Sequence, residues 1–203
     1  MSVDFWIDPS CPWSWVTARW LRDVEGQGIA HVRWRVMSLA ILNEGTELPP
    51  EWVELVRLSW GPVRALHLAA RDVGPDSVWP LLAAFANRYH GDGRRDVAAI
   101  LEESVAECGL PASIARGAWE TSVDDDVRAS HRAAMALGGD DVGSPILGLP
   151  GPAGDRVGFY GPVIASAPTG AAARRLWEGV VALAGTEGFF ELKRTRDVEP
   201  DLS

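Results

Sequence analysis

The segment DFWIDPSCPWSW (residues 4–15) joins the end of an apolar strand to the start of a helix. The run VDFWI at 3–7 is rich in β-forming residues and stops at Asp8-Pro9, because proline cannot continue a β-ladder. From Pro12 to about Glu25, tryptophan and valine then recur at helical spacing. The segment therefore predicts a strand, a turn and a helix, with Cys11 at the turn. Cys11-Pro12-Trp13-Ser14 reads as a redox C-x-x-C motif whose second cysteine is serine.

The rest of the chain follows the order of a known redox fold. A second strand is predicted over 31–41 in HVRWRVMSLAI, and residues 50–137 carry helical patterns only. Strands return at 145–149 and 156–161, and a last helix follows over roughly 168–185. The order β-α-β, helical block, β-β-α predicts an α/β protein with a thioredoxin-like core at 1–49 and 138–203. Residues 50–137 form an all-helical insertion, a cap, between its second and third strands.

Net charge, apolar runs and the cysteine count indicate which partners and which cellular compartment to expect. The 203 residues carry a formal net charge of -9, which disfavours nucleic acid as a partner. No run of about 18 apolar residues and no signal-peptide pattern is present, so we expect a cytoplasmic protein without a membrane partner. The two cysteines lie far apart, which in a reducing compartment favours a lone reactive thiol over a structural disulfide.

Cys11 is expected at a helix N-terminus, with Pro12 in the first helical position. Unpaired backbone N–H groups and the helix dipole favour negative charge there, so we predict a thiol pKa below the ordinary value. Ser14 stands three residues after Cys11, where its hydroxyl can reach back to a thiolate but cannot resolve a disulfide. The alternative is a buried, inert cysteine.

A second motif, VGSP (142–145), opens the third strand of the core. Thioredoxin-like folds place a cis-proline loop at this point of the chain, beside the active cysteine. An X-Pro bond is usually trans, but position in the fold favours a cis bond between Ser144 and Pro145. The Ser144 backbone would then face Cys11 and pair with a bound thiol compound as an added strand does.

The segments DFWIDPSCPWSWVTARW, VMSLAILNE, WGPVRA, VGSP, GFYGPV and FFELKRTRD together resemble the mycothiol-dependent nitroreductase family of actinobacteria, a DsbA-like group with the thioredoxin fold. The resemblance runs nearly end to end. It implies a thiol oxidoreductase that uses mycothiol as its thiol cosubstrate and acts on a small disulfide or electrophile. The family usually carries C-P-W-C, so serine at position 14 implies a monothiol mechanism.

Two alternatives remain beside the monothiol enzyme. Kappa-class glutathione transferases and chromene-carboxylate isomerases share this architecture without a disulfide cycle, so a mycothiol transferase or isomerase is one alternative. A non-catalytic binding protein is the other. A homodimer is compatible with the sequence, although no feature requires it.

The expected site has three groups of residues. Cys11 and Ser14 are the catalytic pair. The active-site loop is formed by Pro12, Trp13, Ser144 and Pro145. Substrate or cosubstrate binding is assigned to Trp13, Asn43, Trp52, Gly143 and Ser144. For Asn43 and Trp52, which follow the second strand, simple capping and packing are equally compatible readings.

No metal site is expected. The four histidines, His31, His67, His90 and His131, show no ligand spacing to one another. Cys108 is expected near a helix C-terminus, where the helix dipole disfavours a thiolate.

Overall fold

The structure is a computed structural model that describes residues 1–202, without the side chain of Glu51. Strands and helices alternate at both ends of the chain, and helices alone fill the middle. The elements are β1 (Ser2–Ile7), α1 (Pro12–Gly26), β2 (His31–Val36), α2 (Leu39–Leu42), α3 (Pro50–Asp72), η1 (Pro75–Ser77), α4 (Val78–Ala86), η2 (Asn87–Gly91), α5 (Val97–Glu107), α6 (Ser113–Gly117), α7 (Asp124–Gly138), β3 (Ile146–Pro150), β4 (Arg156–Tyr160) and α8 (Gly170–Ala184).

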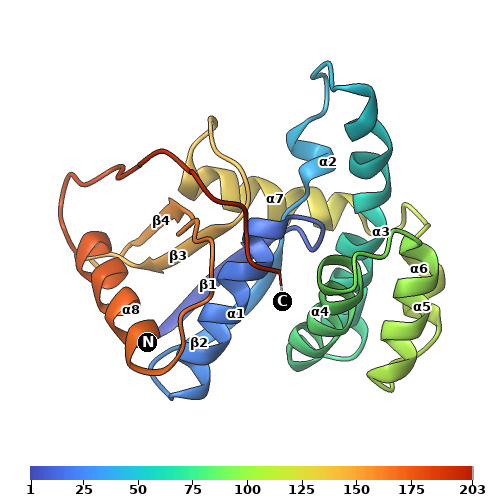
Figure 1. The fold of residues 1–203 in the computed structure, drawn as a ribbon, viewed down its shortest axis with the longest axis horizontal. Coiled ribbons are helices and arrows are strands. Elements are labelled where there is room, and N and C mark those ends of the chain that lie inside the picture. Colours follow the sequence, from blue (N-terminus) through green and yellow to red (C-terminus); the bar gives the residue numbers. More distant parts are fainter. Residues whose placement is uncertain (203) are drawn as a thin grey trace.

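The four strands form one sheet in the order β2-β1-β3-β4. β1 and β2 are parallel, and α1 makes the crossover that a parallel pair requires. β3 runs antiparallel to both β1 and β4, with Phe5 opposite Leu147. This is the thioredoxin-like core that the sequence predicts, and Figure 1 shows the helical insertion beside it.

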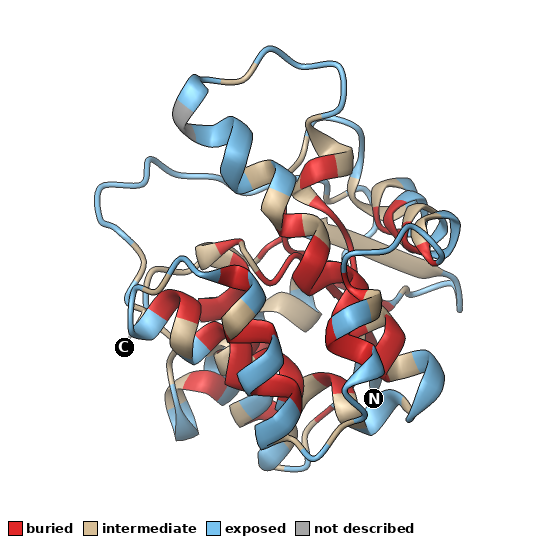
Figure 2. Ribbon diagram, turned by 90° about the vertical axis from the view of Figure 1, so that its right-hand side faces the viewer, coloured by how far each residue is buried: buried red, intermediate tan, exposed pale blue. Residues whose placement is uncertain are grey.

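Alternating side chains of β1 divide the core between the two faces of the sheet. Val3, Phe5 and Ile7 belong to the large buried cluster that includes residues of α1 and α8. Trp6 points to the other face and packs with Ile146 beneath α7. Figure 2 shows the buried residues gathered where the helices meet the sheet. Both faces of the strand that leads to Cys11 are therefore fixed by packing.

Tryptophans connect the helical insertion to the core. The Trp79 ring of α4 stacks on Trp15 of α1, with 6.1 Å between centroids, and lies 4.9 Å from the Trp34 ring of β2. The three rings belong to the large core cluster or pack against it. The insertion thus shares one hydrophobic core with the thioredoxin-like part of the chain.

One predicted strand is shorter than expected. The sequence analysis extended the second strand to residue 41, but β2 ends at Val36 and residues 39–42 form α2. The cause is Ser38, whose hydroxyl accepts hydrogen bonds from the backbone N–H groups of Ala40 and Ile41. A serine cap of this kind starts a helix even within an apolar run.

The last residues cross back over the core (Figure 1). We call residues 189–202 the C-terminal strap. At its start, the Phe189 ring lies 5.8 Å from the Phe159 ring. At its end, the Asp201 N–H donates to the Ala165 carbonyl at 2.6 Å, and Leu202 packs against the core. Among the residues described, no helix has the length and apolar character needed to cross a membrane.

Candidate active site

Cys11 lies in the turn between β1 and α1 and is the N-cap residue of α1. Its backbone N–H donates to the Asp8 carbonyl at 3.0 Å, which closes the turn. The side chain is buried, with 6% of the residue exposed. Its sulfur lies 3.5 Å from the carbonyl oxygen of Ser144. The structure thus brings the two predicted motifs together.

Ser144 and Pro145 are joined by a cis peptide bond. The Ser144 hydroxyl accepts a hydrogen bond from the Asp8 N–H at 3.2 Å and lies 2.6 Å from the Ser14 hydroxyl. Both serines are buried. Either hydroxyl can donate in this pair; when Ser144 donates, the Ser14 proton can turn to the sulfur of Cys11, to which Ser14 is hydrogen-bonded.

The structure corrects the expected ionisation of Cys11. Burial raises the pKa of the Cys11 thiol above its ordinary value, and a negative charge on Asp8 adds to the rise. Hydrogen bonds from the side chain and backbone of Ser14 and from the backbone of Trp13 stabilise the thiolate and oppose this rise in pKa. The helix N-terminus acts in the predicted direction, but loss of solvation outweighs it.

Asp8 lies beneath the site and is fully buried. One carboxylate oxygen accepts the N–H of Ser10 at 2.8 Å, and the other accepts the N–H of Leu39 at 2.7 Å. Burial raises the pKa of Asp8 to about 6, while these hydrogen bonds oppose the rise. Asp8 therefore links the Cys11 turn, the loop of Ser144 and the start of α2.

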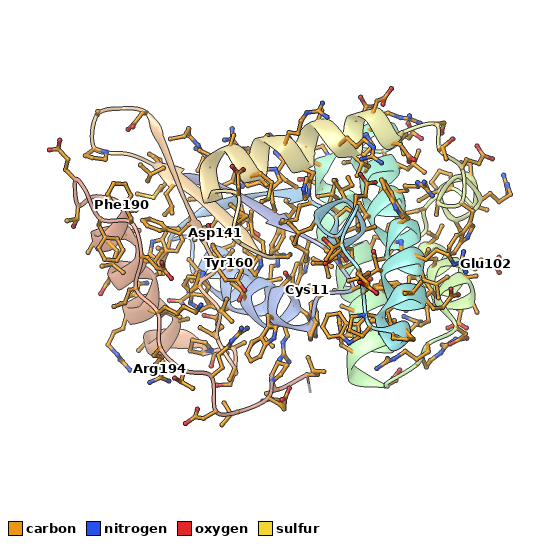
Figure 3. All side chains as sticks on the ribbon, turned by 90° about the horizontal axis from the view of Figure 1, so that it is seen from above. Cys11, Glu102, Asp141, Tyr160, Phe190 and Arg194 are labelled. Atoms are coloured by element: carbon orange, nitrogen blue, oxygen red, sulfur yellow. The ribbon has the colours of Figure 1, made fainter. Side chains whose placement is uncertain are left out.

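Trp13 and two residues that the sequence analysis did not single out stand at the mouth of the site. The Arg196 guanidinium of the strap lies over the Trp13 ring, 5.3 Å from its centroid. Tyr160 ends β4 opposite Ile146, and Figure 3 shows it beside Cys11. The pairing of residue 160 with residue 146 could have revealed Tyr160 from the predicted hairpin. Nothing local in the sequence indicates Arg196.

The remaining predicted binding residues, Gly143, Asn43 and Trp52, differ in their contacts and exposure. A Cβ on Gly143 would stand 3.5 Å from the Tyr160 hydroxyl, so this glycine faces the mouth. Asn43 is the C-cap residue of α2 and donates from its side chain to the Leu39 carbonyl at 2.7 Å. Trp52, in the first turn of α3, is 57% exposed. The contacts of Asn43 fit the capping reading.

One cavity of the described residues lies away from Cys11. It has a volume of about 510 Å³ and is found where β2 meets η1 and the start of α4, with Trp34, Trp79 and Arg33 among its walls. It contains neither Cys11 nor any predicted binding residue.

Two buried histidines are held by the backbone near the site. The His90 Nε2 pairs with the Pro9 carbonyl at 2.9 Å, and burial lowers the His90 pKa to about 4. The His131 Nδ1 accepts the Ser38 N–H at 3.3 Å, and burial lowers its pKa as well. Both rings therefore act as neutral structural groups at neutral pH.

Comparisons with known proteins identify the family of the chain. Residues 10–194 match the family model described as Rv2466c-like, mycothiol-dependent nitroreductase Rv2466c. The Mycobacterium tuberculosis protein Rv2286c, described as uncharacterized, is 32% identical over 204 residues, which cover 98% of this chain and 85% of that protein.

Two solved structures share the fold. A "probable DsbA oxidoreductase" from Streptomyces coelicolor is 19% identical, with a TM-score of 0.58 over 97% of this chain and 94% of that one. The cytosolic disulfide reductase DsbM from Pseudomonas aeruginosa is 18% identical, with a TM-score of 0.56 over 91% of this chain and 100% of that one.

The fold is the thioredoxin-like fold of DsbA-like proteins. The family match places the chain in the class of thiol-dependent oxidoreductases. The family match covers most of the chain. The chain belongs to the Rv2466c-like, mycothiol-dependent nitroreductase family.

Proposed function

We propose that this protein is a cytoplasmic, mycothiol-dependent thiol oxidoreductase with a monothiol mechanism in which Cys11 is the nucleophile. One observation carries the proposal: the Cys11 sulfur lies 3.5 Å from the Ser144 carbonyl beside Pro145, while serine occupies position 14. The nucleophile thus stands next to a backbone edge that can bind a substrate, without a second cysteine in the motif.

The reaction proceeds through a mixed disulfide. The Cys11 thiolate attacks one sulfur of a small disulfide, the S–S bond breaks, and the other sulfur leaves as a thiolate that takes up a proton. The thiolate of free mycothiol then attacks the sulfur bound to Cys11, forms a new disulfide with it and releases Cys11 as a thiolate. Ser14 cannot perform this second step, because a serine hydroxyl stays protonated at neutral pH and does not replace a thiolate as the attacking group.

The proposed roles of the neighbouring residues follow from their contacts. Ser14 donates to the Cys11 thiolate, and Ser144 supports Ser14 through the 2.6 Å pair of hydroxyls. Gly143 and Ser144 offer their backbone to the bound thiol compound, next to Pro145. Pro12 and Trp13 start α1 and form the rim of the site.

We also propose that residues 50–137 act as a cap on a core made of residues 1–49 and 138–203. Asn43 and Trp52 would then border the path of the substrate where the chain enters the cap. The exposed ring of Trp52 supports this role, since a large apolar side chain in solvent is available to a substrate.

Trapping the intermediate tests the mechanism. Protein exposed to the disulfide of mycothiol should gain one mycothiol on the peptide that contains Cys11. The adduct should persist until free mycothiol is added, and Ser14→Cys should let it discharge without an added thiol. Cys108→Ser is the matched control and should leave the adduct unchanged. A native protein that never forms the adduct would contradict the monothiol mechanism.

A mycothiol transferase is the second candidate. The paired hydroxyls of Ser14 and Ser144 favour it, because they could stabilise the thiolate of a bound mycothiol as well as that of Cys11. Cys11→Ala separates the two functions. Conjugation that survives this substitution supports the transferase, whereas loss of all turnover supports the redox enzyme.

A further inference from the structure

The strap places a cation at the mouth of the Cys11 site. Its two ends are fixed, by Phe189 on Phe159 and by the Asp201 N–H on the Ala165 carbonyl. Between them, Arg196 lies over Trp13, with 5.3 Å from guanidinium carbon to ring centroid. Trp13 itself is held in the motif between Cys11 and Ser14.

Tyr160 lies next to Arg196 at the same mouth. Its hydroxyl lies near Gly143, because a Cβ on that glycine would be 3.5 Å from the phenolic oxygen. Burial raises the pKa of Tyr160, the Arg196 guanidinium opposes this rise, and a Cys11 thiolate adds to it. Tyr160 thus forms a side-chain hydrogen bond with Arg196 and is within electrostatic range of Cys11.

One N–H of Arg196 is used by Tyr160, and a guanidinium has five N–H donors, so others are left for a ligand. Several other arginines are paired with carboxylates, as Arg64 is with Asp124 and Arg128 with Glu44. Within residues 1–202, Arg196 forms no ion pair of this kind. Stacking on Trp13 uses one face of its guanidinium, whereas the N–H groups that bind carboxylates point outward from its edge.

We propose that Arg196, Trp13 and Tyr160 form an anion-binding subsite that selects disulfides with a carboxylate close to the reacting sulfur. The guanidinium edge binds the carboxylate, and the Tyr160 hydroxyl donates a second hydrogen bond. The positive charge also offsets, at this one mouth, the repulsion of anions by a chain of net charge -9. The inference rests on the proposed attack by Cys11 and adds the class of substrate.

Two aromatic disulfides that differ in charge test this subsite. Dithiobis-nitrobenzoate carries carboxylates, whereas dithiodipyridine is neutral at pH 8. The rate of reaction of Cys11 with each is measured in a Cys108→Ser background, so that only one thiol responds. Arg196→Gln should slow the reaction with the anionic reagent by about tenfold and leave the neutral one unchanged. Added salt should reduce the difference.

A matched control lies on the same strap. Figure 3 shows Arg194 away from Cys11, so Arg194→Gln removes the same charge from the chain without touching the subsite. It should leave both rates close to those of the parent. Tyr160→Phe should weaken the preference for the anionic reagent in part. Equal slowing of both reagents by Arg196→Gln, or no change in either, overturns the proposal.

A binding measurement separates this inference from the proposed function. If Cys11 reacts with neither reagent, the proposed function fails, and the subsite is decided by calorimetry with nitrobenzoate, which has no sulfur to exchange. Binding by the parent protein that is lost in Arg196→Gln and kept in Arg194→Gln supports the subsite. Absence of binding by the parent overturns it.

Discussion

The hydroxyl oxygens of Ser14 and Ser144 lie 2.6 Å apart, although 130 residues separate the two serines in the chain. The pair stands where a C-x-x-C protein would carry its second sulfur. Ser144 also accepts the N–H of Asp8 and can donate its own proton to Ser14. With serine at position 14, the two hydroxyls form a short chain that ends at Cys11.

Removal of the Ser144 hydroxyl should weaken this support. We expect Ser144→Ala to raise the pKa of Cys11 by about one unit, because Ser14 loses the group that holds its proton toward the sulfur. Ser144→Thr keeps a hydroxyl and should restore the parent value. The rate of iodoacetamide alkylation as a function of pH measures the change.

If Ser144 acts through Ser14, the double variant Ser14→Ala with Ser144→Ala should have the same Cys11 pKa as Ser14→Ala alone. Additive effects of the two substitutions on this pKa would contradict the coupling.

The Cys11 thiol of the parent protein should have a pKa above the ordinary thiol value. Burial raises the pKa of Cys11, so its alkylation rate should keep rising with pH beyond about 8.5, the ordinary thiol value. The Cys108→Ser variant isolates this rate. An inflection near neutral pH would show that the helix N-terminus and the Ser14 hydrogen bonds outweigh burial.

Asp8 and His90 should give opposite contributions to the pH dependence of stability. The pKa of Asp8 is raised from 3.8 to about 6, so its contribution is complete below pH 3.8 and is lost as the pH rises through 6. The pKa of His90 is lowered from 6.5 to about 4, so its contribution is complete above pH 6.5 and is lost as the pH falls through 4. At about 1.4 kcal/mol per pKa unit, each amounts to about 3 kcal/mol.

Between pH 4 and pH 6, the contributions of Asp8 and His90 to the free energy of unfolding should change with pH in opposite directions and nearly cancel in the parent protein. Asp8→Asn leaves the histidine, so the free energy of unfolding should rise with pH over this range. His90→Gln leaves the aspartate, so it should fall. Urea unfolding at several pH values checks both slopes. Parallel curves for the two variants would refute the assignment.

A buried hydroxyl in the cap offers a simple gain in stability. Ser104 in α5 is fully buried, and its hydroxyl has no hydrogen-bond partner among the described residues. Ser104→Ala removes this group at nearly constant volume and improves helix propensity, so we expect the free energy of unfolding to rise by about 1 kcal/mol. Thermal unfolding measures it. Ser130→Ala, whose hydroxyl donates to the Val36 carbonyl, should instead destabilise the protein.

The sequence was sufficient to predict the ends of β1 and α1 near Cys11 and the order of the elements. Pro9 ends β1, Pro12 begins α1, and the order of strands and helices places the Ser144 loop beside Cys11. The prediction of a lowered pKa for Cys11 was wrong. The direction of a pKa shift depends on burial, which a short motif does not reveal. Arg196 was missed for a similar reason: only the path of the strap brings it over Trp13.

Pairing of β1 with β3 has a consequence for how the protein folds. Cys11 and Ser144 are separated by 133 positions, and the whole cap lies between them. A growing or refolding chain must close this long loop before β3 can join the sheet, and contacts of such separation are slow to form. Until then the thiol stays open to solvent. The rate at which Cys11 becomes protected from alkylation during refolding therefore reports how fast the sheet closes.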